Sequence, residues 1–151
     1  MARAHATSET WATSAARTLS DAGYRRGGAR DAVLELLDAQ SCALTAYEIE
    51  EALRGRDRAV GRASVYRILD ELEALHLVTR VDVGQGQARY EPARADHHHH
   101  HLVCDVCGTV IPFHDAALER AIVALSRDVD FDVTDHEIVL HGVCASCRAS
   151  A

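Results

Sequence analysis

The chain has 151 residues, of which 48% are hydrophobic, so it can bury a core in one ordinary domain or two small ones. No apolar run approaches the ~18 residues of a membrane span, and the first residues lack the hydrophobic centre of a signal peptide, so we expect a cytoplasmic protein. The net charge of −7 is uneven, because residues 1–90 hold 12 Arg against 13 acidic residues and residues 91–151 hold 4 Arg against 10.

The first part of the chain is expected to be helical. Apolar residues recur at helical spacing in Trp11–Leu19 and again in Val33–Leu37. Thr45 and Glu48 have the spacing of a capping box, which predicts the start of a third helix. A fourth helix should begin at Ala63–Ser64. Its buried stripe would consist of Val65, Ile68, Leu69, Leu72 and Leu75.

After the fourth helix, the spacing of apolar residues changes from helical to alternating, which predicts a hairpin. Residues 77–83 alternate as in a strand, residues 84–86 can turn, and residues 87–91 return. The segment 54–67 holds five arginines and one aspartate, which predicts a basic surface at the start of the fourth helix. Helices followed by a hairpin are typical of a winged helix-turn-helix, which places one helix in the major groove of DNA. We therefore predict a DNA-binding domain over residues 1–91.

A second domain is predicted over residues 97–151, after a short polar hinge at residues 92–96. This part is acidic and holds most of the histidines and cysteines. Its pattern predicts strands at 102–103 and 110–111, a helix from Ala116 to Arg127, and strands at 131–133 and 138–140. The expected fold class is α+β, with a small α/β domain at the C-terminal end. A unit of about 55 residues normally needs a metal or a partner to be stable.

Two Cys-x-x-Cys pairs, Cys104 with Cys107 and Cys144 with Cys147, give the most specific signal in the chain. Two residues between thiolates let both sulfur atoms of a turn reach one ion, and two such turns complete a tetrahedral shell. A redox dithiol and chance spacing are the alternatives. We predict a structural zinc site that stabilises the fold, because a closed shell leaves no position for a substrate.

Five consecutive histidines, His97–His101, precede the first cysteine pair, and their internal position disfavours a purification tag. In an extended segment alternate side chains point to opposite sides, which separates His98 and His100 from His99 and His101. Each pair would need further ligands to hold an ion. A solvated run that chelates metal nonspecifically is the alternative. Candidate further donors are Glu119, His136, Glu91 and Cys42.

The stretches GRASVYRILDELEALHLVTRV, HHHHHLVCDVCG and CASC together resemble the ferric uptake regulator family of bacterial metal-responsive repressors. The resemblance runs from about Leu19 to Cys147. It implies a homodimer in which an N-terminal winged helix binds duplex DNA and a C-terminal α/β domain dimerises. Metal bound between the domains would set the two winged helices at the spacing of a palindromic operator in front of metal-uptake genes.

The resemblance also implies three metal sites. The structural zinc ligands would be the four cysteines. The dimerisation-domain site would take His98, His100, Glu119 and His136, although an aspartate commonly stands where His100 does. The interdomain regulatory site would take Glu91, His99 and His101. This site usually includes a histidine just before the third helix, where this chain has Cys42 as the nearest donor.

Cys42 bears on which metal is sensed. A free cysteine can simply be a small buried apolar residue. If Cys42 is a ligand, its sulfur with two imidazoles favours Zn²⁺ over Fe²⁺, which normally has nitrogen and oxygen donors. We therefore predict a regulator of the zinc-uptake branch, with an iron-responsive regulator as the alternative. A peroxide sensor has little support, because that variant needs an aspartate-rich iron site.

On the DNA side, the resemblance matches Tyr66 and Arg67 to the recognition-helix motif. Arginine can bond a guanine edge, and tyrosine can pack on a thymine methyl group or bond a phosphate. Ser64 and Arg62 would bind phosphate near the helix N-terminus, and Arg30 matches a phosphate-contacting arginine at the start of the second helix. The alternative is that Tyr66 covers the core and the arginines form a solvated face.

Two other classes of function compete with a repressor. A zinc hydrolase or deaminase would need an open metal position with a nearby general base, and neither His-x-Glu nor His-Glu-x-x-His occurs in the chain. We therefore expect no enzymatic activity. A metal-storage protein would use the histidine run but leaves the arginine-rich helix unexplained.

Overall fold

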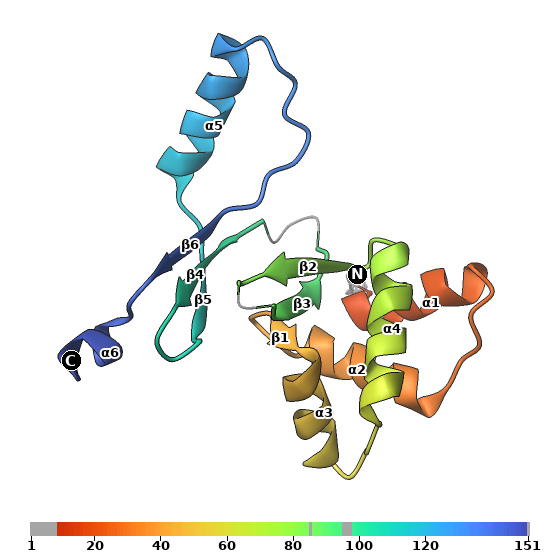
Figure 1. Ribbon diagram of the computed structural model, residues 1–151. Coiled ribbons are helices and arrows are strands. Elements are labelled where there is room, and N and C mark those ends of the chain that lie inside the picture. Colours follow the sequence, from red (N-terminus) through yellow and green to blue (C-terminus); the bar gives the residue numbers. More distant parts are fainter. Residues whose placement is uncertain (1–8, 85, 95–97, 151) are drawn as a thin grey trace, which may run out of the picture. The chain divides into compact units, whose positions relative to one another are not determined.

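The computed structural model describes residues 9–84, 86–94 and 98–150, which divide into two compact units, Met1–Ala95 and Asp96–Ala151. Figure 1 shows the helices and strands of each unit. Part of the predicted hinge, the first histidine of the run, His97, and Gln85 of the predicted turn lie outside the described residues. Within the described ranges, no helix combines the length and apolar character needed to cross a bilayer.

The first unit contains four helices: α1 (Trp11–Asp21), α2 (Gly28–Asp38), α3 (Ala46–Arg54) and α4 (Arg62–Ala74). The predicted capping box is present, because the Thr45 side chain accepts from the Glu48 backbone and the Glu48 carboxylate accepts from the Thr45 N–H at 2.8 Å. Helix α4 begins one residue before the predicted Ala63, at Arg62, and its N-cap Gly61 supplies no side-chain hydrogen bond. The backbone N–H groups of its first turn therefore have no side-chain acceptor at the cap.

The wing of the first unit is a three-stranded antiparallel sheet with the order β1-β3-β2. Strands β2 (Val78–Asp82) and β3 (Ala88–Pro92) form the predicted hairpin, and Gly84 and Gly86 adopt positive φ angles in its turn. Strand β1 (Leu44–Thr45) was not predicted, because two residues are too few to show an alternating pattern. Four helices with this hairpin make a winged helix-turn-helix, as predicted.

The core of the first unit lies between the helices and is closed by the wing. Four of the five residues in the predicted stripe of α4 are buried, and Leu75 is partly buried against the same cluster. The Trp11 indole donates to the Leu77 carbonyl at 3.2 Å, which ties α1 to the start of the wing. The largest fully buried apolar side chains are Leu19, Leu34, Leu36, Leu37, Ile49, Leu53, Ile68, Leu69 and Leu72.

The second unit is a three-stranded sheet with the order β5-β4-β6. Strand β4 (His100–Cys104) lies in the centre, antiparallel to β5 (Val110–Phe113) and parallel to β6 (Val139–Gly142). Helix α5 (Ala116–Asp128) joins β5 to β6, and the short helix α6 (Ala145–Ala149) follows. Together with the winged helix, this α/β unit gives the α+β class that the sequence predicts.

The predicted strand at residues 131–133 is wrong. Phe131 folds back onto the end of α5, where its N–H donates to the Ser126 carbonyl at 3.0 Å and the Ser126 hydroxyl donates to the Phe131 carbonyl. Both edges of β4 are already paired with β5 and β6. Residues 131–133 do not add to the outer edge of β5 or β6 either, and Phe131 and Val133 are exposed.

We expect Thr45→Ala to destabilise the first unit by about 1 kcal/mol, because it removes the side-chain acceptor of the capping box. Denaturant unfolding followed by circular dichroism would measure this loss. Thr45→Ser is the matched control, since it keeps the hydroxyl and should stay close to wild type. An equal loss in both variants would contradict the capping role.

Candidate metal centres and nucleic-acid interface

The two cysteine pairs meet because β4 and β6 are parallel neighbours. Cys104 ends β4 and Cys107 follows in the turn to β5, whereas Cys144 and Cys147 follow the end of β6. The four Sγ atoms lie within 4.8 Å of one another, and those of Cys107 and Cys144 are 3.8 Å apart. A tetrahedral ion with metal–sulfur distances of about 2.3 Å separates its sulfur atoms by about 3.8 Å. This donor set therefore fits a four-coordinate zinc ion.

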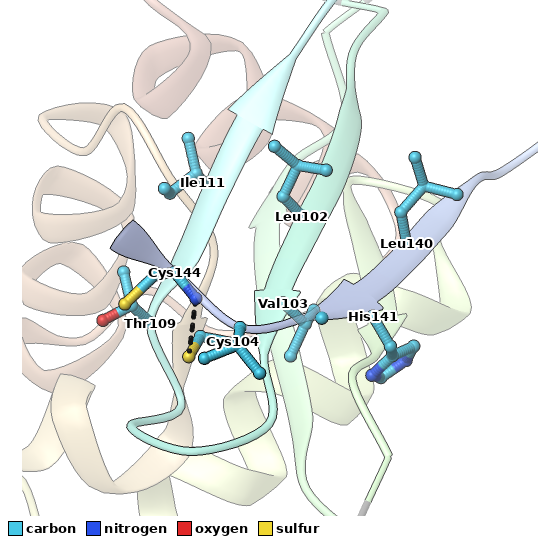
Figure 2. Close-up of a pocket in the computed structure, with 10 residues that line it drawn as sticks. Leu102, Val103, Cys104, Thr109, Ile111, Leu140, His141 and Cys144 are labelled. Carbon is cyan, nitrogen blue, oxygen red and sulfur yellow. Dashed lines mark hydrogen bonds between the residues drawn. The ribbon is translucent and has the colours of Figure 1, made fainter. Parts of the chain in front are cut away.

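Backbone geometry shapes the first cysteine turn for this purpose. Gly108 has a φ of +73°, and its N–H donates to the Cys104 carbonyl at 2.8 Å. The Cys144 N–H donates to the Cys104 sulfur at 3.3 Å, as Figure 2 shows. Such N–H groups stabilise a thiolate, and they lower the pKa of Cys104 to about 6. Cys104 is therefore a thiolate at neutral pH, which is the form that binds a metal cation.

The other cysteines show the effect of crowding four sulfur atoms. The Thr109 hydroxyl, first among several donors, lowers the pKa of Cys107. The pKa of Cys147 is raised to about 12, first by its hydrogen bond with Cys144 and then by the one with Cys107. Several adjacent thiolates repel one another, so a metal-free site retains protons. A divalent cation would replace those protons.

A second group of donors forms on one side of β4. The Nε2 atoms of His98 and His136 are 3.0 Å apart, and His100 Nε2 is 2.7 Å from Glu119 Oε1. Glu119 also lies 3.1 Å from His136 and 3.5 Å from His98. Ligands of a tetrahedral ion bound at about 2.0 Å lie roughly 3.3 Å from one another, so the four groups fit one ion. The structure brings together all four residues predicted for this site.

The elements explain how this group is positioned. His100 is the first residue of β4 and is fully buried, with its ring 5.5 Å from that of Phe113 on β5. Glu119 stands in the first turn of α5, which Asp115 caps by accepting from two backbone N–H groups at 2.8 Å. The hydrogen bond from His100, with the nearby His136 and His98, lowers the pKa of Glu119. The carboxylate is therefore present as a ligand anion.

The remaining two described histidines of the run form a separate pair. The rings of His99 and His101 have centroids 5.0 Å apart, as expected for residues two apart in an extended segment. Their predicted co-ligands, Cys42 and Glu91, belong to the first unit. Cys42 lies two residues before Leu44, the first residue of β1, and Glu91 follows Tyr90, the partner of Leu44 on the antiparallel strand β3. Cys42 and Glu91 thus lie at the same end of the β1–β3 ladder.

The predicted DNA-binding residues of α4 and α2 differ in how exposed and how engaged their side chains are. Tyr66 and Arg67 are exposed, and Ser64 is half-buried. The Arg62 Nε donates to Glu50 at 2.8 Å. Arg30 is 2.5 Å from Glu71 and also donates to the Arg25 carbonyl, and its side chain is only 13% exposed. Arg30 would have to leave this pair to reach a phosphate.

An open cleft of about 500 Å³ lies between α3, the start of α4 and the wing. Tyr66 lines it together with two residues that the sequence analysis missed, Tyr47 and Arg80. Tyr47, the second residue of α3, is 57% exposed, and Arg80 stands at an outward position of β2. A large aromatic residue on the polar face of α3 was the available signal. The cleft has the aromatic and cationic lining that suits a nucleic-acid backbone.

The chain resembles known proteins over most of its length. Residues 21–141 match the model of the ferric uptake regulator family. The chain belongs to this family. It is 32% identical over 135 residues to the ferric uptake regulation protein of Bacillus subtilis, covering 87% of this chain and 91% of that one. It is 35% identical over 131 residues to the Legionella pneumophila ferric uptake regulation protein, covering 86% and 96%. The family resemblance inferred from the sequence is confirmed.

Solved structures of family members share the fold. The Vibrio cholerae ferric uptake regulator is 32% identical, with a TM-score of 0.77 over 85% of this chain and 98% of that chain. The Helicobacter pylori regulator, described as having three functional metal binding sites, is 26% identical, with a TM-score of 0.83 over 98% and 97%. This ferric uptake regulator family member is a metal-responsive transcription regulator.

We expect Cys104→Ser to release the zinc of the four-cysteine site and to unfold the second unit, because three thiolates and a hydroxyl hold zinc far more weakly. Metal content by mass spectrometry and circular dichroism would measure both effects. Val106→Ala is the control, since this exposed residue of the same turn belongs to none of the donor groups. Full zinc retention by Cys104→Ser would contradict the assignment.

Proposed function

We propose that this protein is a metal-dependent repressor of metal-uptake genes that responds to zinc. One observation supports this proposal: the same chain combines a winged helix with clustered metal donors. Tyr66 and Arg67 are exposed at the start of α4, and the metal donors lie in the other unit. The protein would act in the cytoplasm by binding rather than by catalysis.

In this proposal residues 1–91 bind duplex DNA, residues 92–96 are a hinge, and residues 97–151 bind metal and dimerise. Arg67 would read a guanine edge and Tyr66 a thymine methyl group or a phosphate. Arg67 suits this role because it makes no ion pair with any other described residue. Ser64, Arg62 and Arg30 would contact phosphates.

A second copy of this chain is the proposed partner of the second unit. Only Val103, Cys104, His100 and His101 are buried among its described residues, so its own core is small. Leu102 of β4 lies in register with Ile111 of β5 and Leu140 of β6, and all three are exposed. Figure 2 shows them on the same side of the sheet, beside a pocket of about 170 Å³. An apolar row of this kind favours burial against an identical row across a two-fold axis, which would also match a palindromic operator.

The three metal sites would have different roles. The four cysteines would hold a structural zinc ion that stabilises the second unit, whose apolar core is small. His98, His100, Glu119 and His136 would form a second site within the dimerisation domain. Regulation would fall to Cys42, Glu91, His99 and His101, because these come from both units. A metal bound there favours whichever arrangement satisfies all of its ligands at once, which couples metal to DNA binding.

Zinc is preferred over iron because the only sulfur donor outside the four-cysteine site, Cys42, lies at the same end of the β1–β3 ladder as Glu91. The second candidate is an iron-responsive regulator. It is favoured by the relatives at 32% and 35% identity, both of which are ferric uptake regulation proteins.

We expect His99→Ala and His101→Ala to lose metal-dependent DNA binding while the dimer remains folded, because each removes one regulatory ligand. Fluorescence anisotropy of a labelled duplex, titrated under buffered Zn²⁺ or anaerobic Fe²⁺, would measure this. His114→Ala is the control, since this exposed histidine lies outside the three donor groups. Wild-type affinity of both variants in saturating metal would contradict the site, and stimulation by iron alone would favour the second candidate.

We expect Leu102→Glu to convert the dimer to monomers, because it places a charge in the middle of the apolar row. Sedimentation velocity would measure the assembly state. Leu102 is exposed in the single chain, so the substitution should leave the four-cysteine zinc in place. An unchanged dimer with bound zinc would contradict this interface.

A further inference from the structure

Glu50 is an unusual acidic residue for a surface that binds DNA. It lies on α3 with its side chain 11% exposed, and it accepts hydrogen bonds from two arginines. Arg54 Nη2 is 3.0 Å from one carboxylate oxygen, and Arg62 Nε is 2.8 Å from the other. Two cations therefore neutralise one largely buried carboxylate, and the carboxylate is fixed by contacts on both of its oxygens.

Arg62 is held on two sides but remains accessible. Glu50 occupies its Nε, and the guanidinium carbon lies 5.5 Å from the centre of the Tyr47 ring. The side chain is nevertheless 57% exposed. Within the described residues, Nη1 and Nη2 of Arg62 form no hydrogen bond. The edge of the guanidinium that can bind an anion through two N–H groups is thus left open.

The position of Arg62 on the helix adds to this arrangement. It is the first residue of α4, and the preceding Gly61 gives no side-chain cap, so backbone N–H groups lie nearby. An anion is favoured at such a helix start. The hydrogen bond to Glu50, followed by its charge, raises the pKa of Arg62, whose guanidinium is cationic at neutral pH in any case.

We propose that Glu50, with Tyr47 as a stacking platform, is a positioning residue that presents the Nη groups of Arg62 to a DNA phosphate at the start of α4. This inference rests on the proposed DNA-binding function. A free arginine would have to be ordered when DNA binds, whereas Arg62 is ordered beforehand. Removing the Glu50 charge should therefore weaken binding, although removing a negative charge near DNA would otherwise strengthen it.

The test compares Glu50→Gln with Glu51→Gln, each with Arg62 intact and with Arg62→Ala. Glu51 is the matched control, because it is adjacent, is exposed and pairs with Arg54 but not with Arg62. Affinity would be measured by fluorescence anisotropy in saturating metal, using a labelled duplex that the wild-type protein selects from random-sequence DNA. We expect Glu50→Gln to lower affinity about 3–10-fold with Arg62 present and to cause no such loss with Arg62→Ala. Glu51→Gln should have the same effect in both backgrounds.

A second readout needs no DNA. The Nε–H proton of Arg62 should exchange slowly with solvent in NMR spectra of the wild type, and this protection should disappear in Glu50→Gln. Equal effects of Glu50→Gln with and without Arg62, or an unprotected Nε–H in the wild type, would overturn the positioning role alone. A folded, metal-loaded wild type that selects no DNA would overturn the proposed function and this inference with it. Thermal unfolding of each variant separates loss of fold from loss of positioning.

Discussion

The parallel pairing of β4 with β6 is the constraint on which the second unit depends. Two parallel neighbours end at the same edge of a sheet, so the cysteine turn after β4 meets the one after β6. Few described residues of this unit are buried, and apolar burial alone gives it little stability. Metal bound by the four cysteines would supply stability that a larger core supplies elsewhere. The unit and its metal site would fold together.

The same central strand also organises the histidines. Because side chains alternate along an extended segment, His98 and His100 turn toward Glu119 and His136, and His99 pairs with His101. The strand that ends in Cys104 thus begins with candidate metal donors on two sides. A metal bound by the cysteines at one end of β4 would restrict the register of the strand, and with it the direction of both histidine pairs. The donor groups of the second unit therefore share one backbone segment, residues 98–104.

Local patterns predicted much of this from the sequence, and contacts between elements account for what was missed. The capping box at Thr45 and the stripe of α4 need only neighbours along the chain, and so does the alternation of the histidines. The strand expected at residues 131–133 failed because alternation does not show that Phe131 bonds to Ser126 at the end of α5 instead of joining the sheet. The pairing of Arg30 with Glu71, 41 residues away, has no local signal. Sequence spacing identified candidate ligands, but it could not tell which arginines are already engaged.

The pairing of arginines with carboxylates also bears on how a chain of net charge −7 would bind DNA. Arg54, Arg58 and Arg62 of the basic segment each pair with a carboxylate, so the local field is weaker than five arginines suggest. Nonspecific attraction, which depends on the number of free cations, is correspondingly reduced. In the proposed function, binding would rely on a few groups, such as the exposed Arg67 and the open edge of Arg62, which would favour a correctly placed guanine or phosphate over DNA in general. A near-neutral winged helix of this kind would bind arbitrary DNA weakly, so a metal that aligns two such units in a dimer would have a large effect on operator occupancy.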